Sequence, residues 1–185
     1  QVISMAWSKQ SSMLVVGLDS GDIYLLGYDV ADNRNFTSER CLEQVHSKRV
    51  MRLHIDEKRK LLYSVGEDKK FVCIDLEDKT VVSRLTLPSN KLTHLVVHPQ
   101  YKMAFTSDTD GSIFVIDISK KYPDLLQKIS TMMKGPIRSL VKVPNKDIIL
   151  ASSGEDGLIK AFHNATMKEG RSAFTCVLQI RGPPH

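Results

Sequence analysis

The sequence is poor in cysteine and has no long apolar run, and each shortage excludes a class of protein. Its three cysteines, Cys41, Cys73 and Cys176, stand far apart. Such a sparse, odd set forms neither a disulfide framework nor a zinc site. The longest apolar runs, at 13–17 and 148–151, fall far short of the roughly 18 residues of a membrane span. No signal peptide is visible at its start. We therefore expect an intracellular, cytoplasmic protein with reduced thiols.

Catalytic and cofactor motifs are missing as well. The sequence contains no Gly-x-Gly-x-x-Gly, no phosphate loop, no His-Glu-x-x-His and no Cys-x-x-Cys. His94 and His98 have the spacing of helical metal ligands, but they fall in an expected strand, where residues four apart lie roughly 13 Å from each other. We therefore expect no metal, no cofactor and no catalytic residues.

The charge is dispersed rather than concentrated. The net charge is +5 and the isoelectric point is near 9.1, which could suit nucleic acid or an anionic membrane. However, the densest basic groups, at 58–60, 69–70 and 120–121, fall where we expect hairpin turns or strand starts. We interpret them as solvated tips, so nucleic acid is not the expected partner and membrane contact is expected only indirectly.

The sequence repeats itself four times. One set of apolar positions recurs at intervals of 48, 42 and 45 residues: Val2, Val50, Leu92 and Ile137. A second set of turn positions recurs at intervals of 48, 42 and 46: Ser20, Asp68, Asp110 and Asp156. Because two independent markers keep step, we divide residues 1–185 into repeats at 1–45, 46–87, 88–132 and 133–180.

Each repeat predicts four β-strands. Its apolar runs are short and rich in Val, Ile, Leu and Phe, and turn residues such as Asp-Gly separate them. The fourth strands are expected at 40–45, 80–87, 125–131 and 173–180. No helical periodicity is sustained, so the pattern predicts an all-β fold of four-stranded antiparallel blades.

At this point the sequence resembles the WD-repeat family of β-propellers over nearly its whole length. The family's repeat carries a His, a Ser or Thr, an Asp and a Trp-Asp pair. The second repeat fits best, with His46, Ser64 and Asp68, although Ile74 replaces the Trp before Asp75. The third and fourth repeats keep only part of the pattern, with Pro88 and Met133 at the His position.

The resemblance implies that these polar residues are structural. In the family they form a buried, hydrogen-bonded set that ties the strands of one blade together. We interpret them in this way, and not as a Ser–His–Asp catalytic triad, because no Gly-x-Ser-x-Gly elbow occurs. The residues concerned are His46, Ser64, Asp68, Thr106, Asp110, Ser152 and Asp156.

The resemblance also implies an incomplete ring. WD-repeat propellers usually have seven blades, whereas this chain holds about four. Isolated blades would leave inter-blade faces and strand edges open. We therefore expect the chain to be part of a larger propeller, completed by further blades or by self-association with a second copy.

A binding surface is implied by the family as well. WD-repeat proteins commonly bind peptides on the rim around the central channel, through residues next to the repeat's first strand and its central turn. The alternative is a solubilising rim without a ligand. The candidate partner-binding residues are Asp19, Arg49, Met51, Glu67, Lys91, Thr93, Arg138 and Glu155.

We thus expect a non-enzymatic scaffold that binds peptides or protein partners through this rim. A narrower similarity, over 17–21, 45–50 and 66–71, is to endosomal propellers that carry an inserted FYVE zinc finger. The cysteine cluster of that finger is absent, so lipid binding does not carry over. The remaining alternatives are a membrane-associated adaptor, a nucleic-acid-associated propeller and an enzymatic propeller completed by missing blades.

Overall fold

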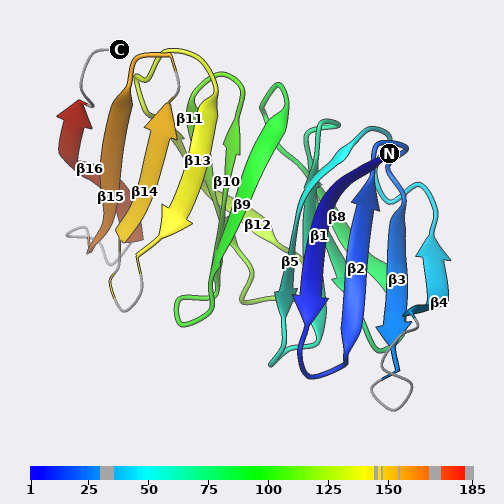
Figure 1. Cartoon of the computed structure of the whole chain (residues 1–185). Coiled ribbons are helices and arrows are strands. Elements are labelled where there is room, and N and C mark those ends of the chain that lie inside the picture. The colour runs from blue at the N-terminus through cyan, green and yellow to red at the C-terminus, as the bar shows by residue number, and fades with distance from the viewer. Residues whose placement is uncertain (30–35, 144–145, 147, 154, 167–171, 182–185) are drawn as a thin grey trace. The chain divides into compact units, whose positions relative to one another are not determined.

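The chain is all-β. A computed structural model describes residues 1–29, 36–143, 146, 148–153, 155–166 and 172–181. Over these residues it contains the strands β1 to β16 and no helix (Figure 1). The strands pair in chain order into four antiparallel sheets of four strands each. The predicted fold class, an all-β array of four-stranded antiparallel sheets, is confirmed.

The chain forms two compact units. The first comprises Gln1–Leu92 and Lys120–Pro123, and the second comprises Thr93–Ser119 and Asp124–His185. The first unit holds two sheets. The first sheet consists of β1 (Val2–Ser8), β2 (Met13–Leu18), β3 (Ile23–Tyr28) and β4 (Phe36–Leu42). The second sheet consists of β5 (Val50–Asp56), β6 (Leu61–Gly66), β7 (Lys70–Asp75) and β8 (Thr80–Thr86).

The second unit also holds two sheets. The third sheet consists of β9 (Leu92–His98), β10 (Met103–Asp108), β11 (Ser112–Asp117) and β12 (Asp124–Ser130). The fourth sheet consists of β13 (Ile137–Lys142), β14 (Ile148–Ser153), β15 (Leu158–Thr166) and β16 (Ser172–Arg181). Each of the four sequence repeats thus contains one sheet.

One fourth strand was placed wrongly from the sequence. We predicted a strand over 40–45, but β4 begins at Phe36 and ends at Leu42. Phe36 pairs with Tyr28 across the sheet, and the two rings lie 5.1 Å apart between centroids. This aromatic pair extends the strand toward its N-terminal end. The other three fourth strands begin within one residue of the prediction.

The turn between the second and third strands has the same backbone form in every sheet. Its last residue has a positive φ: 94° at Gly21, 68° at Lys69, 78° at Gly111 and 62° at Gly157. Glycine adopts this conformation without strain, whereas a side chain makes it unfavourable. Lys69 is therefore the strained member of the set.

These turns also hold the connection that follows the fourth strand. In the first sheet the amide of His46 donates to the carbonyl of Gly21 at 3.0 Å. The amide of Leu87 donates to Lys69 at 2.9 Å, and that of Thr131 to Gly111 at 3.3 Å. Three connections are thus fixed by the turn of the sheet they leave.

Each unit has its own hydrophobic core between its two sheets. In the first unit Val15 and Leu25 of the first sheet pack in one cluster with Val50 and Val72 of the second sheet. In the second unit the core includes Phe105, whose ring lies 4.8 Å from that of Phe174. Each of these cores joins the two sheets of its unit.

Candidate functional site

The most complete polar cluster lies in the second sheet. His46 precedes β5, Ser64 lies on β6 and Asp68 lies in the turn before β7. The Nδ1 atom of His46 lies 2.8 Å from Asp68 Oδ1, and its Nε2 atom lies 2.8 Å from Ser64 Oγ. An ionised carboxylate can only accept, so Nδ1 donates to Asp68, while Nε2 and the Ser64 hydroxyl form the second hydrogen bond.

Asp68 also accepts from the backbone. Its Oδ2 accepts the amide of Ser47 at 3.0 Å, and its Oδ1 accepts that of Lys70 at 3.3 Å. Burial opposes the charge of Asp68, but the hydrogen bond and charge of His46, with these amides, outweigh it and lower its pKa. The cluster therefore ties the loop before β5 to the turn before β7.

Two neighbouring positions explain how the cluster fits. A Cβ atom at Gly66 would lie 2.5 Å from His46 Nδ1, so only glycine leaves room for the imidazole. Ile74, at the position of the family's Trp, is fully buried in the apolar core of the unit. The cluster thus consists of three polar side chains, and position 74 contributes no fourth one.

The third repeat has a buried carboxylate at a position that we did not select from the sequence. Asp110 is exposed, whereas Asp108 is fully buried. Asp108 Oδ1 accepts the amides of Asp110 at 3.0 Å and Ser112 at 2.8 Å. Asp108 ends β10 as Gly66 ends β6, so the carboxylate stands where the second repeat has glycine.

The other polar residues of the third repeat are buried. Thr106 Oγ1 donates to the carbonyl of His94 at 2.7 Å, so it binds a backbone and not an imidazole. Pro88, which we aligned with the family's His, is exposed, and Leu87 beside it is buried. Burial raises the pKa of Asp108, since it outweighs the two amide hydrogen bonds.

In the fourth sheet the aspartate keeps its backbone role. Asp156 accepts the amides of Lys134 at 2.8 Å and Leu158 at 3.1 Å. Asp68 accepts the two corresponding amides in the second sheet. Met133 is buried at the position of His46. The backbone of Ser152 pairs with Ile159, but its side chain lies outside the described residues.

The structure brings three of the rim residues together in the first unit. Glu67 lies between two cations, with its carboxylate oxygens 3.9 Å from Arg49 Nη1 and 3.7 Å from Lys91 Nζ. The side chains of Arg49 and Lys91 are 56% and 53% exposed, against 18% for Glu67. Met51 is half-buried nearby in sequence, and Asp19 is exposed and contacts the amino group of Gln1.

The remaining rim residues belong to the second unit. Thr93 Oγ1 contacts Ser107 Oγ at 2.9 Å, while Arg138 and Glu155 are exposed. The side chain of Glu155 lies against Gly135, where an added Cβ would meet its carboxylate. Two of the candidate rim residues, Arg49 and Lys91, thus share one acidic partner in the first unit.

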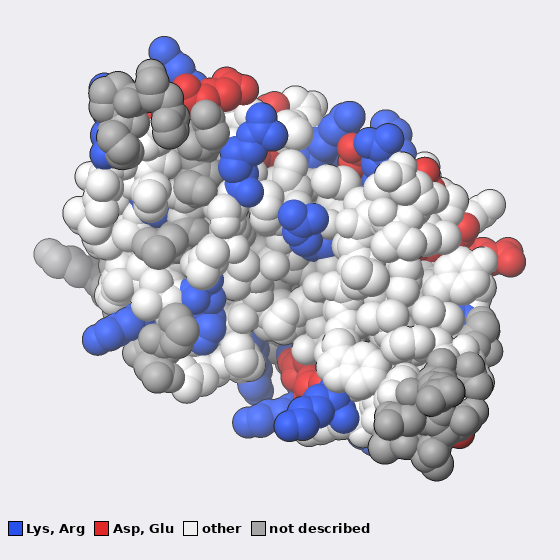
Figure 2. All heavy atoms as spheres, in the orientation of Figure 1, with Lys and Arg blue, Asp and Glu red and all other residues white. Residues whose placement is uncertain are grey.

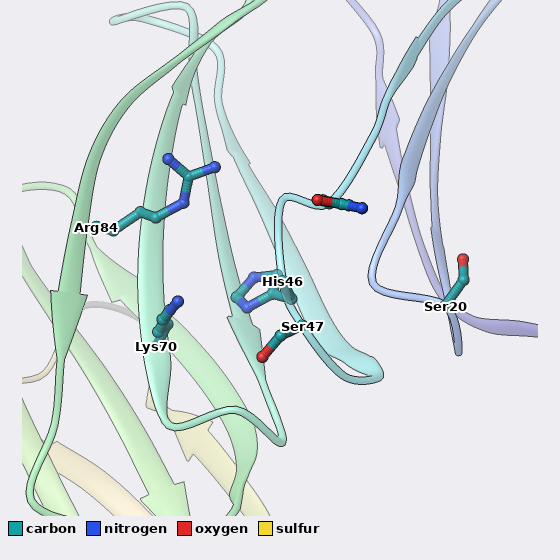
Figure 3. A pocket seen from close by; sticks show the side chains of 6 residues that line it. Ser20, His46, Ser47, Lys70 and Arg84 are labelled. Atoms are coloured by element: carbon teal, nitrogen blue, oxygen red, sulfur yellow. The ribbon is translucent and has the colours of Figure 1, made fainter.

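A polar groove in the first unit was missed from the sequence. It has a volume of about 530 Å³, and its lining residues are Ser20, Gln44, His46, Ser47, Lys70 and Arg84. Figure 3 shows Lys70 and Arg84 on neighbouring strands, with His46 and Ser47 on the loop beside them and Ser20 on a separate turn. From the sequence we interpret Lys70 as part of a solvated hairpin tip, and Arg84 belongs to no motif that would single it out.

Neither metal-binding nor membrane-spanning features are found in the part of the chain that the structure describes. No group of three or more His, Cys, Asp and Glu side chains there could hold a metal ion. No helix there has the length and apolar character needed to cross a membrane. On the face seen in Figure 2, Lys and Arg side chains occur in several small groups, some of them beside Asp or Glu.

Comparison with known proteins gives no assignment. The sequence matches no protein-family model, and no curated protein matches it.

Proposed function

We propose that this chain is a non-enzymatic interaction module of the WD-repeat type, which binds an acidic segment of a protein partner through Arg49 and Lys91. The observation that carries the proposal is the exposed Arg49–Glu67–Lys91 group. Both ion pairs are long and more than half of each basic side chain faces solvent. A partner carboxylate can therefore replace Glu67 at little cost, because exposed pairs contribute only about 0–1 kcal/mol.

The backbone beneath this group supports a recognition role. Glu67 directly precedes Asp68, whose carboxylate accepts from His46 and from two amides. The amide of Glu67 donates to the carbonyl of Arg49 at 3.0 Å. Two of the three charged residues thus lie on backbone that is fixed before a partner arrives, which lowers the entropy cost of binding.

The Ser64–His46–Asp68 geometry supports the non-enzymatic interpretation. Although a hydroxyl, an imidazole and a carboxylate are aligned as in a hydrolase, Ser64 is fully buried. A nucleophile must reach the substrate carbonyl, and no substrate reaches this oxygen in the folded unit. The cluster therefore stabilises the loop.

The test is selection of random peptides on the immobilised chain, followed by affinity measurement on variants. We expect the selection to yield acidic peptides. Their affinity should fall by at least about fivefold in the double variant Arg49→Ala, Lys91→Ala, because exposed charge contacts are removed. Glu67→Gln should strengthen the same peptides, because it removes a competing carboxylate. The double variant Lys9→Ala, Lys58→Ala removes equal charge elsewhere and should bind normally. Affinity that is indifferent to both rim variants and to salt would refute the proposal.

We also propose that the sheets are blades of a larger propeller. In support, the face of the first sheet that turns away from the second sheet is apolar and open. Met5 and Trp7 lie on it, 65% and 47% exposed, and Met5 shares this face with Val16 and Tyr24 through cross-strand pairs. Exposed apolar faces of this kind mark interaction surfaces.

The fourth sheet presents a similar open face. Leu178 and Ile180 of β16 are 52% and 50% exposed, and they pair with Ala161 and Ile159 of β15. Light scattering on this 20.8 kDa chain tests whether a second copy covers such faces. A defined oligomer that the substitutions Met5→Lys and Leu178→Lys dissociate would support blade-to-blade packing. A stable monomer without aggregation would contradict the need for further blades.

A further inference from the structure

We propose that the groove between the first and second sheets, lined by Ser47, Lys70 and Arg84, binds the phosphate monoester of a phosphorylated peptide segment. This inference rests on the proposed function, because it assumes that the partner is a protein, but it concerns a site separate from Arg49 and Lys91. All residues that line the groove belong to the first unit (Figure 3).

The strand register brings the two cations onto one wall. Lys70 and Val72 lie on the same face of β7, since residues two apart point the same way. Arg84 of β8 pairs directly with Val72. Val72 packs in the core between the two sheets, so this face turns toward the first sheet. Lys70 and Arg84 therefore both extend from the second sheet toward the groove.

Both cations lack an acidic partner. Neither Lys70 Nζ nor the Arg84 guanidinium forms an ion pair with any residue that the structure describes. Arg84 Nε donates to the carbonyl of Val45 at 3.4 Å, which orients the guanidinium and leaves its outer donors free for a ligand. Two cations match the charge of a phosphate monoester, about −1.5 to −2 at neutral pH.

Two carboxylates lie behind the walls, and both are already engaged. Asp22 accepts the amide of Gln44 at 2.8 Å and the hydroxyl of Ser20 at 2.6 Å. Asp68 accepts from His46 and from the amide of Ser47. Neither is among the residues that line the groove. Lys70 and Arg84 are therefore the charged residues that line the groove. The hydroxyl group of Ser47 and the side-chain amide of Gln44 lie beside them as further hydrogen-bond donors.

The size and lining of the groove favour a peptide over a lipid headgroup. Its volume of about 530 Å³ accommodates a phosphorylated side chain together with the adjoining backbone. None of its lining residues is apolar, so the groove itself offers nothing to insert into a bilayer. Polyphosphorylated headgroups would also carry more charge than two cations neutralise.

The experiment is a nuclear magnetic resonance titration of the whole chain with a defined probe. The probe is acetyl-Ala-Ala-phosphoserine-Ala-Ala-amide, compared with its unphosphorylated form and with myo-inositol 1-phosphate. We expect amide shifts at Ser47 and Lys70 and a shift of Arg84 Nε with the phosphopeptide at millimolar concentration. The double variant Lys70→Ala, Arg84→Ala should weaken binding at least tenfold, roughly, because two charge-assisted hydrogen bonds are lost.

The controls separate this inference from the proposed function. The variant Lys9→Ala, Lys58→Ala removes equal charge at the other end of the strands and should bind the probe normally. Arg49→Ala, Lys91→Ala should also leave the probe's affinity unchanged, even where it abolishes binding of selected acidic peptides. Absent groove shifts, equal binding of the unphosphorylated peptide, or equal binding of the inositol phosphate would each overturn the inference. If Lys70→Ala, Arg84→Ala misfolds, Lys70→Gln, Arg84→Gln gives the same test.

Discussion

Replacing His46 with alanine should destabilise the first unit more than any exposed substitution. The change removes the hydrogen bonds from His46 to Asp68 and Ser64, both 2.8 Å long. A hydrogen bond to a charged group contributes about 1.5–3 kcal/mol and a neutral one about 1 kcal/mol. We therefore expect a loss of about 2.5–4 kcal/mol, a large part of the ~5–15 kcal/mol that stabilises a typical domain.

Urea unfolding followed by tryptophan fluorescence measures this loss. The sole tryptophan is Trp7, on β1 of the same unit. A double-mutant cycle with Asp68→Asn should give a coupling of at least about 1 kcal/mol, because the two side chains are in contact. A loss below about 1 kcal/mol for His46→Ala, or a coupling near zero, would refute the structural role of the cluster.

The pH dependence of the same variant provides a second check. The pKa of Asp68 is lowered in the folded chain, so its contribution is present above the unfolded value of about 3.9. That contribution is lost as the pH falls through the lowered folded value. The effect of His46→Ala should therefore shrink in acid. Met133→Ala, the matched apolar position of the fourth sheet, should show a loss that does not change with pH, measured by circular dichroism.

Four further outcomes are expected, each measured as a shift of the urea midpoint. Gly157→Ala should cost about 1–2 kcal/mol through its positive φ alone, since an added Cβ there meets nothing within 4 Å. Gly21→Ala should cost ~1–3 kcal/mol more, because its Cβ would lie 1.9 Å from the carbonyl oxygen of His46; equal costs would contradict the packing. Lys69→Gly should stabilise by about 0.5–1 kcal/mol through relief of backbone strain, and a loss would show that the side chain matters. Asp108→Asn should stabilise the chain at neutral pH. The pKa of Asp108 is raised in the folded chain, so the stability that this carboxyl contributes below its unfolded pKa is lost as the pH rises through the folded value. Urea midpoints that do not change between pH 4 and pH 8 would contradict this expectation.

The sequence predicted the four-stranded sheets because turn residues and apolar runs are local signals. Asp68 and Asp156 were found because each lies at a fixed spacing from its repeat's apolar anchor. The buried carboxylate of the third repeat was missed, since its turn offers both Asp108 and Asp110 and spacing alone selects the second. Burial distinguishes them, and burial depends on the neighbouring loop rather than on the turn.

The groove could not be predicted because it depends on strand register. Lys70 and Arg84 are distant in sequence and meet on one wall only through the pairing of β7 with β8. That pairing shifts at Cys73/Ile74, so the alternation of side chains along β8 cannot simply be counted back from β7. A pattern of charged residues gives no sign of such a shift.

The contrast between Gly66 and Asp108 restricts how such repeats can change over time. A repeat with a buried histidine needs glycine at the end of its second strand, because any side chain there collides with the ring. A repeat with a carboxylate at that position has no room for the histidine. Converting one kind of repeat into the other therefore takes two substitutions, one at the histidine position and one at the end of the second strand. Made alone, either substitution leaves a steric clash or an unfilled cavity. Degenerate repeats of this kind should diverge in paired steps, so a histidine grafted into the third repeat should be tolerated only together with Asp108→Gly.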